Sequence, residues 1–241
     1  MQIVITMAGL GTRFRKAGYD VPKYEITAHG RTLFAWSMES LRGYFAPDND
    51  WFFIVRREDD AQEFIMKEWE EFHDAGTATV IEIDYMTDGQ ATTALIASEY
   101  WKSDEPLMIY NIDTYVEAGC LKAEDIEGDG FIPCFNAPGD HWSFVKTDEA
   151  GDAVEVREKE RISDNCTLGA YYFRTCRLYE EMYESYYRDP KMVEKGEKYV
   201  APLYNHMIGM GMKVRICLVG AEHVHVLGTP EELDVFKNED I

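Results

Sequence analysis

Several common features are missing from this chain of 241 residues, and each absence excludes a class of protein. No stretch approaches the twenty consecutive apolar residues that a membrane-spanning helix needs. The first residues pass directly into an apolar segment, without the basic region and cleavage site of a secretory signal. The five cysteines form no C-x-x-C pair, so we expect free thiols in a cytoplasmic protein.

Positive charge is scarce. The chain has 24 Lys and Arg against 45 Asp and Glu, a net charge of −21. An acidic surface releases few counterions from a polyanion, so we expect no nucleic acid as partner. Because no apolar run is long enough to span a bilayer, we also expect no membrane partner. Residues 1–45 are the exception, with six basic and three acidic side chains. A basic segment in an acidic chain predicts a focused anion site.

The hydrophobic pattern is that of an α/β protein, with no linker, repeat or low-complexity tract, so we expect one domain over 1–241. Strands and helices alternate up to about residue 130, which predicts a parallel sheet with right-handed crossovers. The expected strands are 2–6, 51–55, 79–83 and 107–110, and the expected helices are 33–44, 59–74 and 90–101. Short strands follow at 131–135, 142–146, 153–156 and 168–173, then helices at 176–187 and 200–210, strands at 213–219 and 223–227, and a helix from Pro230.

A glycine loop follows the first strand and is the most informative segment. It consists of Ala8, Gly9, Leu10, Gly11 and Thr12, and Arg13 and Lys23 come after it. Glycine lets backbone N–H groups approach a phosphate, and two cations match the charge of a nucleoside triphosphate. The third glycine of a dinucleotide fingerprint and the Gly-Lys-Ser/Thr of a P-loop are both absent.

The segment G-x-G-T-R followed by P-K resembles the signature of the sugar-phosphate nucleotidyltransferases, or nucleoside-diphosphate-sugar pyrophosphorylases. The resemblance implies a Rossmann-like three-layer α/β/α fold with a central mixed, mostly parallel sheet. It implies an enzyme of the EC 2.7.7 type that acts in the biosynthesis of nucleotide sugars and polysaccharides. Its substrates would be a nucleoside triphosphate and a phosphorylated small molecule, and Arg13 and Lys23 would be its catalytic cations. Residues 1–130 would form the nucleotide half and 131–241 the acceptor half.

Two further segments of the first half fit this resemblance. Asp113 follows the strand that ends at Tyr110, where an aspartate often only caps a turn. The family's principal Mg²⁺ ligand stands at this place, so the resemblance assigns that role to Asp113. Gly89 and Gln90 open the third helix after a possible N-cap at Asp88. The resemblance implies that they contact the nucleotide base.

The acceptor half carries a Glu-Lys pair that is, on local grounds, typical of a solvated surface. It stands in an order that resembles the family's E-K…S-N…G-x-Y-x-F block. The resemblance implies that Lys159 holds the acceptor's phosphate and that Glu158 and Asn165 bind its polar groups, with Gly169 in the same block. The base and the acceptor stay open, the latter between a sugar 1-phosphate, phosphocholine and other metabolites.

The C-terminal block, residues 225–233, resembles the family's D-x-G-T-P-x-x-L segment but departs from it at one position. The second metal aspartate should stand two residues before Gly228, and that residue is Val226. His223 and His225 are expected to be structural, because Mg²⁺ prefers oxygen ligands. Two other functions therefore stay open. One is a glycosyltransferase of related fold, although Asn111 and Asp113 supply only half of its D-x-D motif. The other is a nucleotide-binding protein without turnover.

Overall fold

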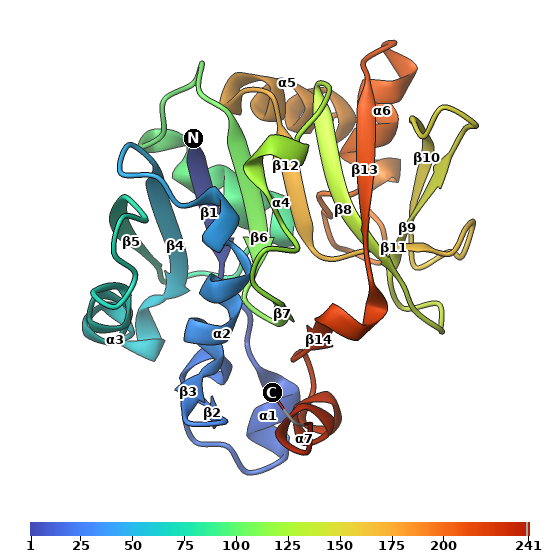
Figure 1. Ribbon diagram of the computed structural model, residues 1–241. Helices are drawn as coiled ribbons and strands as arrows, with labels where there is room; N and C mark the ends of the chain where they lie inside the picture. Colours follow the sequence, from blue (N-terminus) through green and yellow to red (C-terminus); the bar gives the residue numbers. More distant parts are fainter. Residues whose placement is uncertain (240) are drawn as a thin grey trace.

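The computed structural model describes residues 1–239 and 241, which form one large sheet between two layers of helices (Figure 1). The helices are α1 (Thr12–Lys16), α2 (Leu33–Ser40), α3 (Gln62–Trp69), α4 (Gln90–Leu95), α5 (Cys176–Tyr186), α6 (Leu203–Gly209) and α7 (Pro230–Lys237). The first-half strands are β1 (Gln2–Thr6), β2 (Thr27–Ala28), β3 (Arg31–Thr32), β4 (Asp50–Arg56), β5 (Thr77–Ile83), β6 (Leu107–Asn111) and β7 (Thr114–Val116). The remaining strands are β8 (Gly130–Asn136), β9 (Ser143–Thr147), β10 (Ala153–Glu158), β11 (Asn165–Thr167), β12 (Ala170–Phe173), β13 (Val214–Val219) and β14 (Val224–Val226).

The central sheet is mixed, as expected, and runs through both halves of the chain. Its order is β10-β9-β11-β8-β12-β6-β1-β4-β5, and β13 pairs with β8 as the tenth strand. The strands β6, β1, β4 and β5 are parallel neighbours, as the alternation predicted. Beyond β6 the pairing becomes antiparallel through β12 and β8, while β13 is parallel to β8.

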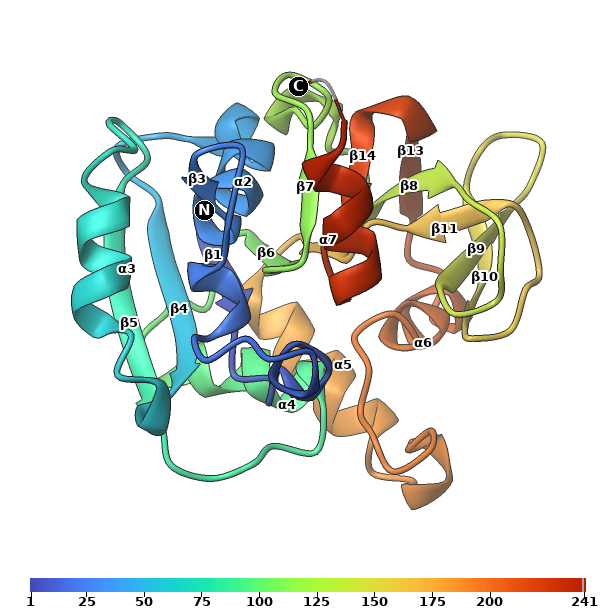
Figure 2. The same cartoon turned by 90° about the horizontal axis from the view of Figure 1, so that it is seen from below.

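Two apolar cores lie on opposite faces of this sheet, because alternate side chains of a strand point to opposite faces. The first core contains Ile3 and Ile5 of β1 and is covered by α2 and α3. The second contains Val4 and is covered by α4, α5 and α6. Figure 2 shows the same arrangement from below, so the fold is the three-layer α/β/α sandwich that the sequence predicted.

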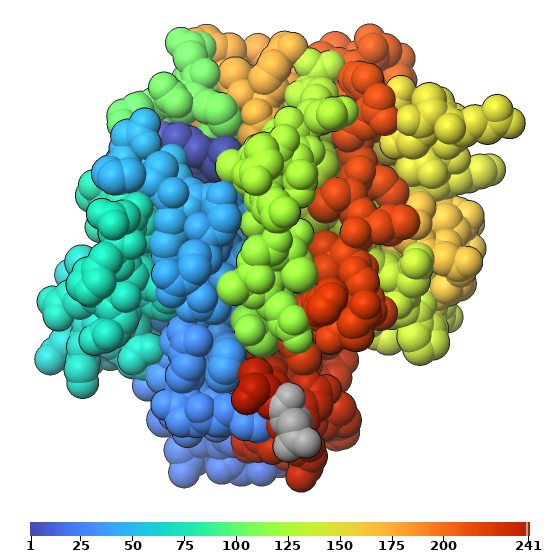
Figure 3. Space-filling view, viewed as in Figure 1, coloured from blue at the N-terminus to red at the C-terminus, as the bar shows by residue number. Residues whose placement is uncertain are grey.

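A third, smaller core joins the two ends of the chain. Phe14 of α1 and Trp36 of α2 pack with Leu233 and Phe236 of α7, and Tyr115 of β7 closes the cluster. Figure 3 shows the red C-terminal segment against the blue N-terminal segment at the lower end of the molecule. β14 pairs with β7 in a separate two-stranded sheet, so the expected strand at 223–227 is not part of the large one.

Several helices are shorter than their apolar periodicity predicted. The expected helix 59–74 is regular only over α3, although Phe72 beyond its end is still buried. The expected helices 33–44 and 90–101 end in 3₁₀ turns, and the expected helix 200–210 begins at Leu203. Burial persists past the end of a helix when the following turn also packs on the core, so periodicity overestimates length.

The expected strand 168–173 is also divided. Gly169, with φ +77°, separates β11 from β12. Both strands pair with β8, but the neighbour on the other edge changes here from β9 to β6. The helix α1 and the hairpin of β2 and β3 were not predicted, because five and two residues are too short to show a period.

Two properties of the described residues concern the chain's surroundings. None of the helices is both long and apolar enough to cross a bilayer. The five cysteine thiols are free, and three of them, Cys134, Cys166 and Cys217, lie on strands.

Candidate active site

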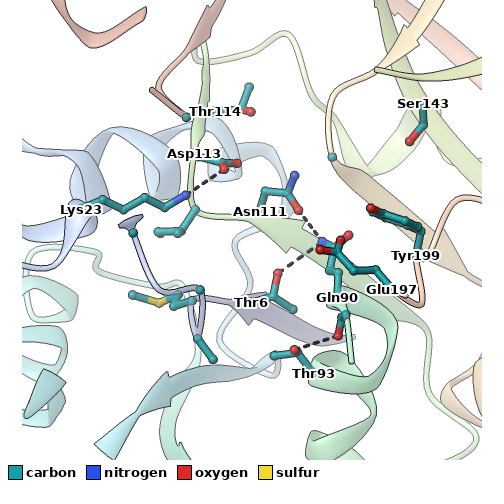
Figure 4. A pocket seen from close by; sticks show the side chains of 18 of the residues that line it. Thr6, Lys23, Gln90, Thr93, Asn111, Asp113, Thr114, Ser143, Glu197 and Tyr199 are labelled. Atoms are coloured by element: carbon teal, nitrogen blue, oxygen red, sulfur yellow. Dashed lines mark hydrogen bonds and ion pairs between the residues drawn. The ribbon is translucent and has the colours of Figure 1, made fainter. Parts of the chain in front are cut away.

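A cleft of about 660 Å³ opens where β1 and β6 end. Thr6 and Asn111, the last residues of these neighbouring strands, form part of its floor (Figure 4). The glycine loop lines one wall, and Ser143 and Glu158 of the antiparallel region line the other. Ligands of open α/β sheets bind at the carboxyl ends of the strands, so this cleft lies where the topology places a ligand.

The glycine loop lines the cleft over its full length, from Ala8 to Thr12, together with Arg13. Gly11 adopts φ +59° and forms the N-cap of α1, a left-handed conformation that glycine adopts without steric cost. A Cβ on Gly9 would meet nothing within 4 Å, so open space lies above the loop. Arg15 holds the loop from behind, because its Nε donates to the carbonyl of Leu10 at 3.3 Å.

Lys23 and Asp113 meet on the cleft floor. Lys23 Nζ lies 2.8 Å from Asp113 Oδ2, and both side chains are partly exposed to the cleft (Figure 4). Arg13 is exposed, and among the described residues it makes no ion pair. Two cations therefore line the cleft beside the loop: Lys23, which is paired with Asp113, and Arg13, which has no ion-pair partner among the described residues.

Gln90 stands at the first turn of α4 and belongs to a hydrogen-bonded row across the strand ends. Its Nε2 donates to Thr6 Oγ1 at 3.3 Å and to Asn111 Oδ1 in a short contact (Figure 4). These bonds fix the amide so that Nε2 is used within the protein and Oε1 is left as an acceptor. The row joins β1, β6 and α4 into one rigid floor.

Gly89, which we expected to contact the nucleotide base, lines the cleft and also packs closely against main chain. A Cβ there would lie 2.4 Å from the carbonyl oxygen of Lys198, and φ is +135°. Main-chain bonds run both ways at this contact: Ala91 N donates to Lys198 O at 3.0 Å, and Lys198 N donates to Asp88 O at 2.6 Å. Glycine is therefore required at position 89 for the close packing of its backbone against the main chain of Lys198.

The segment 195–199, which we call the strap, thus crosses from the second half of the chain to the start of α4. Lys198 Nζ pairs with Asp88 Oδ2 at 2.8 Å. Burial alone would raise the pKa of Asp88, but the hydrogen bonds from Lys198 and Thr92 outweigh it and lower the pKa. The strap places Glu197 and Tyr199 in the lining of the cleft. Sequence reasoning missed both residues, because the segment carries no motif.

The residues that the resemblance assigns to the acceptor are only partly brought together. Glu158 lines the cleft, is 8 % exposed and accepts a short hydrogen bond from Ser143 Oγ. Gly169 also lines it, and its missing Cβ makes room for Asn111, whose Nδ2 would lie 2.2 Å from that atom.

Lys159 does not line the cleft directly. Its Nζ donates to the Tyr199 hydroxyl at 2.8 Å and lies 3.4 Å from Glu158 Oε1. Burial would lower the pKa of Lys159, but these two partners outweigh it and raise the pKa, so the amine stays protonated. Asn165 is not among the lining residues, because its Nδ2 donates to the carbonyl of Val145 at 3.0 Å within the sheet.

The C-terminal block reaches the cleft through Val226, Gly228 and Glu232. Its place is fixed by the pairing of β14 with β7 and by a hydrogen bond from Leu227 N to Asp113 O at 2.8 Å. The two histidines point elsewhere: His223 Nδ1 lies 2.8 Å from Glu117 Oε2, and His225 stacks on Tyr115 at 5.2 Å.

The whole chain is similar to solved structures of nucleotide-transferring enzymes. It superposes on the nucleoside-diphosphate-sugar pyrophosphorylase of Vibrio cholerae RC9 with a TM-score of 0.89 and 34 % identity, over 98 % of this chain and 100 % of the other. The chain belongs to the nucleoside-diphosphate-sugar pyrophosphorylase family of sugar-phosphate nucleotidyltransferases. The family that the sequence motifs indicated is thus confirmed.

Two more distant structures of this fold family cover the chain completely. The inositol-1-phosphate CTP transferase of T. maritima has a TM-score of 0.76 and 16 % identity, over 97 % of its length. A putative glucose-1-phosphate thymidylyltransferase from Bacillus anthracis has a TM-score of 0.78 and 12 % identity, also over 97 %. At these identities the likeness is one of fold. No protein-family model and no curated protein matches the sequence.

Proposed function

We propose that this family member transfers a nucleoside monophosphate from a nucleoside triphosphate to a phosphorylated small molecule and releases pyrophosphate. The observation that carries the proposal is the Lys23–Asp113 pair at 2.8 Å, beside a glycine loop that leaves open space above it. A triphosphate in that space would have backbone on one side and two cations, Lys23 and Arg13, within the same cleft. Phosphoryl-type transfer depends mainly on positioning and charge neutralisation, and the glycine loop and these two cations would supply both.

In the proposed reaction an oxygen of the acceptor's phosphate attacks the α-phosphorus in line. The bond from the α-phosphorus to the bridging oxygen of the β-phosphate breaks, and pyrophosphate leaves with the electron pair. Arg13 would neutralise the departing pyrophosphate, and Lys23 the charge that grows at the α-phosphate. Such preorganised cations act on charge that develops in the transition state, so they raise kcat more than affinity.

A divalent metal ion fits the donors at this place. Asp113 offers a partly exposed carboxylate, the oxygen donor that Mg²⁺ prefers, and its present partner is the cation of Lys23. In the described part of the chain no three His, Cys, Asp or Glu side chains come together to hold a metal by themselves. Mg²⁺ commonly takes one or two carboxylates and completes its shell with water and substrate phosphates. When bound, Mg²⁺ would supply Lewis acidity at the phosphate oxygens.

The opposite wall would hold the acceptor. Glu158 is fixed by Ser143 and can accept hydrogen bonds from hydroxyl or amine groups. Lys159 is charged, but its Nζ donates a hydrogen bond to the Tyr199 hydroxyl. It would act on the acceptor's phosphate either by leaving that hydroxyl and binding the phosphate itself, or by polarising the hydroxyl. The product would be a nucleotide sugar or a comparable activated metabolite.

The test is a panel assay on the purified protein. Pyrophosphate release is measured with each of the common nucleoside triphosphates, combined with sugar 1-phosphates and with phosphorylated amines, in the presence of Mg²⁺. We expect release that requires both substrates. Transfer of sugar from a nucleotide sugar, with no pyrophosphate formed, would instead indicate a glycosyltransferase. Triphosphate binding without turnover on the whole panel would indicate a binding protein.

A further inference from the structure

The first turn of α7 brings a second carboxylate to the cleft. We propose that Glu232 serves as a ligand of the divalent metal ion together with Asp113. It would take the role of the family's second metal aspartate, whose position in this chain is occupied by Val226. The proposal rests on the proposed function only in the identity of the ion and is otherwise argued from the positions of these side chains.

Gly228 lies beside both carboxylates. A Cβ built on Gly228 would lie 3.4 Å from Glu232 Oε2 and 3.6 Å from Asp113 Oδ2. The two oxygens therefore border the same small space, which the glycine leaves open toward the cleft. All three residues line that cleft. Two carboxylate oxygens around an open space are a donor set for a hard divalent cation.

The backbone holds this arrangement in place. Leu227 N donates to the main-chain carbonyl of Asp113, so the residue before Gly228 is fixed to the metal-binding loop itself. Val226 pairs with Thr114, which follows Asp113. The register of β14 on β7 thus determines the position of Glu232. The side chain of Val226 has no atom that could bind a metal ion, so this residue contributes only its backbone pairing.

Glu232 is free to take this role. The order Thr229-Pro230-Glu231-Glu232 is that of a capping box, in which the glutamate side chain bonds back to the N-cap backbone. Only half of the box forms: Thr229 Oγ1 accepts from Glu232 N at 3.2 Å. Within the described residues the Glu232 carboxylate has neither a hydrogen bond nor an ion pair, and it lies in the cleft lining.

The local charge also favours a cation. Asp113 and Glu232 bring two negative charges, and Lys23 is the cation paired with Asp113. One negative charge is left without a partner among the described residues. A divalent ion placed between the carboxylates would compensate it, and Lys23 would then be free to turn toward a phosphate.

The experiment measures Mn²⁺ binding by electron paramagnetic resonance, with the ion alone and with a nucleoside triphosphate added. The variant is Glu232→Gln, which keeps the shape and removes the charge. Its matched control is Glu231→Gln, because Glu231 is exposed, lies next in the chain and is absent from the lining. We expect Glu232→Gln and Asp113→Asn to weaken Mn²⁺ binding by about tenfold or more. Glu231→Gln should stay within about twofold of wild type.

A second variant tests the space itself. Gly228→Ala keeps both carboxylates and places a methyl group at ordinary contact distance from each, so the fold should tolerate it. It should weaken Mn²⁺ binding as well. Wild-type Mn²⁺ affinity in Glu232→Gln, or no Mn²⁺ binding by the unaltered protein in either condition, would overturn the proposal. The protein could also bind Mn²⁺ in a way that depends on Glu232 and yet release no pyrophosphate. That result would contradict the proposed function and support the metal site.

Discussion

Lys23 and Asp113 are ninety residues apart in the chain, yet their charged atoms lie 2.8 Å apart on the cleft floor. The pair has little to do with stability, since partly exposed ion pairs contribute about 1 kcal/mol or less. Its value is positional: the pair lies at the place where a triphosphate and a metal ion would meet in the proposed reaction. Four predictions test the site around this pair.

The first concerns the carboxylate. Asp113→Asn should abolish Mg²⁺-dependent pyrophosphate release, because the amide keeps the shape and loses the charge that attracts the ion. Denaturant unfolding should change by about 1 kcal/mol or less. Wild-type-like turnover at millimolar Mg²⁺ would show that Asp113 is not the principal ligand.

The second concerns the cations of the loop. Arg13→Ala and Lys23→Ala should each fold normally and lower kcat/KM by about 10²–10³, the usual loss for one group that stabilises developing charge. Lys16→Ala is the matched control, since Lys16 is exposed on α1 and does not line the cleft. A loss of similar size in Lys16→Ala would mean that overall charge, and not position, is being measured.

The third concerns the strap. Gly89→Ala should destabilise the protein by about 2–4 kcal/mol in denaturant unfolding, because its Cβ would collide with main chain that has no room to move. Gly211→Ala is the control for conformation alone: φ is +79°, but a Cβ there would meet nothing within 4 Å. It should cost about 1–2 kcal/mol. Equal losses in the two variants would mean that contact with Lys198 is unimportant.

The fourth concerns the acceptor. Lys159→Ala should raise the acceptor's KM or lower kcat, while calorimetric affinity for the triphosphate alone stays within about 1 kcal/mol of wild type. The reason is that Lys159 contacts Tyr199, whereas the bonds from the strap to α4 come from Lys198. Lys146→Ala, an exposed lysine of β9, is the control. Equal loss of triphosphate affinity in Lys159→Ala would remove the basis for a separate acceptor half.

Sequence reasoning worked best where local pattern and topology agree. The strands that end at Thr6 and Asn111 were predicted to within one residue, and parallel pairing then brings their carboxyl ends together. That is why the glycine loop, Lys23 and Asp113 could be expected in one cleft. The fold class and the family followed from the same motifs.

Other parts depend on atoms that the sequence does not distinguish. The contact of the strap with Gly89 is made by backbone groups of Lys198, which any residue would carry. Asn165 was expected in the site, but its strand turns the amide toward the carbonyl of Val145. Glu232 was read only as part of a helix start, because nothing in its neighbours shows that the capping bond is left unmade.

The small core at the lower end of the molecule has a consequence for how the protein is made. Every strand of the large sheet is complete once the chain has been synthesised to Val219. Phe14 of α1 and Trp36 of α2 then still lack their contacts with Leu233 and Phe236. A nascent chain can therefore form its sheet before it can form its cleft. The part of the cleft lining that Val226, Gly228 and Glu232 supply is therefore in place only when α7 has packed on this small core.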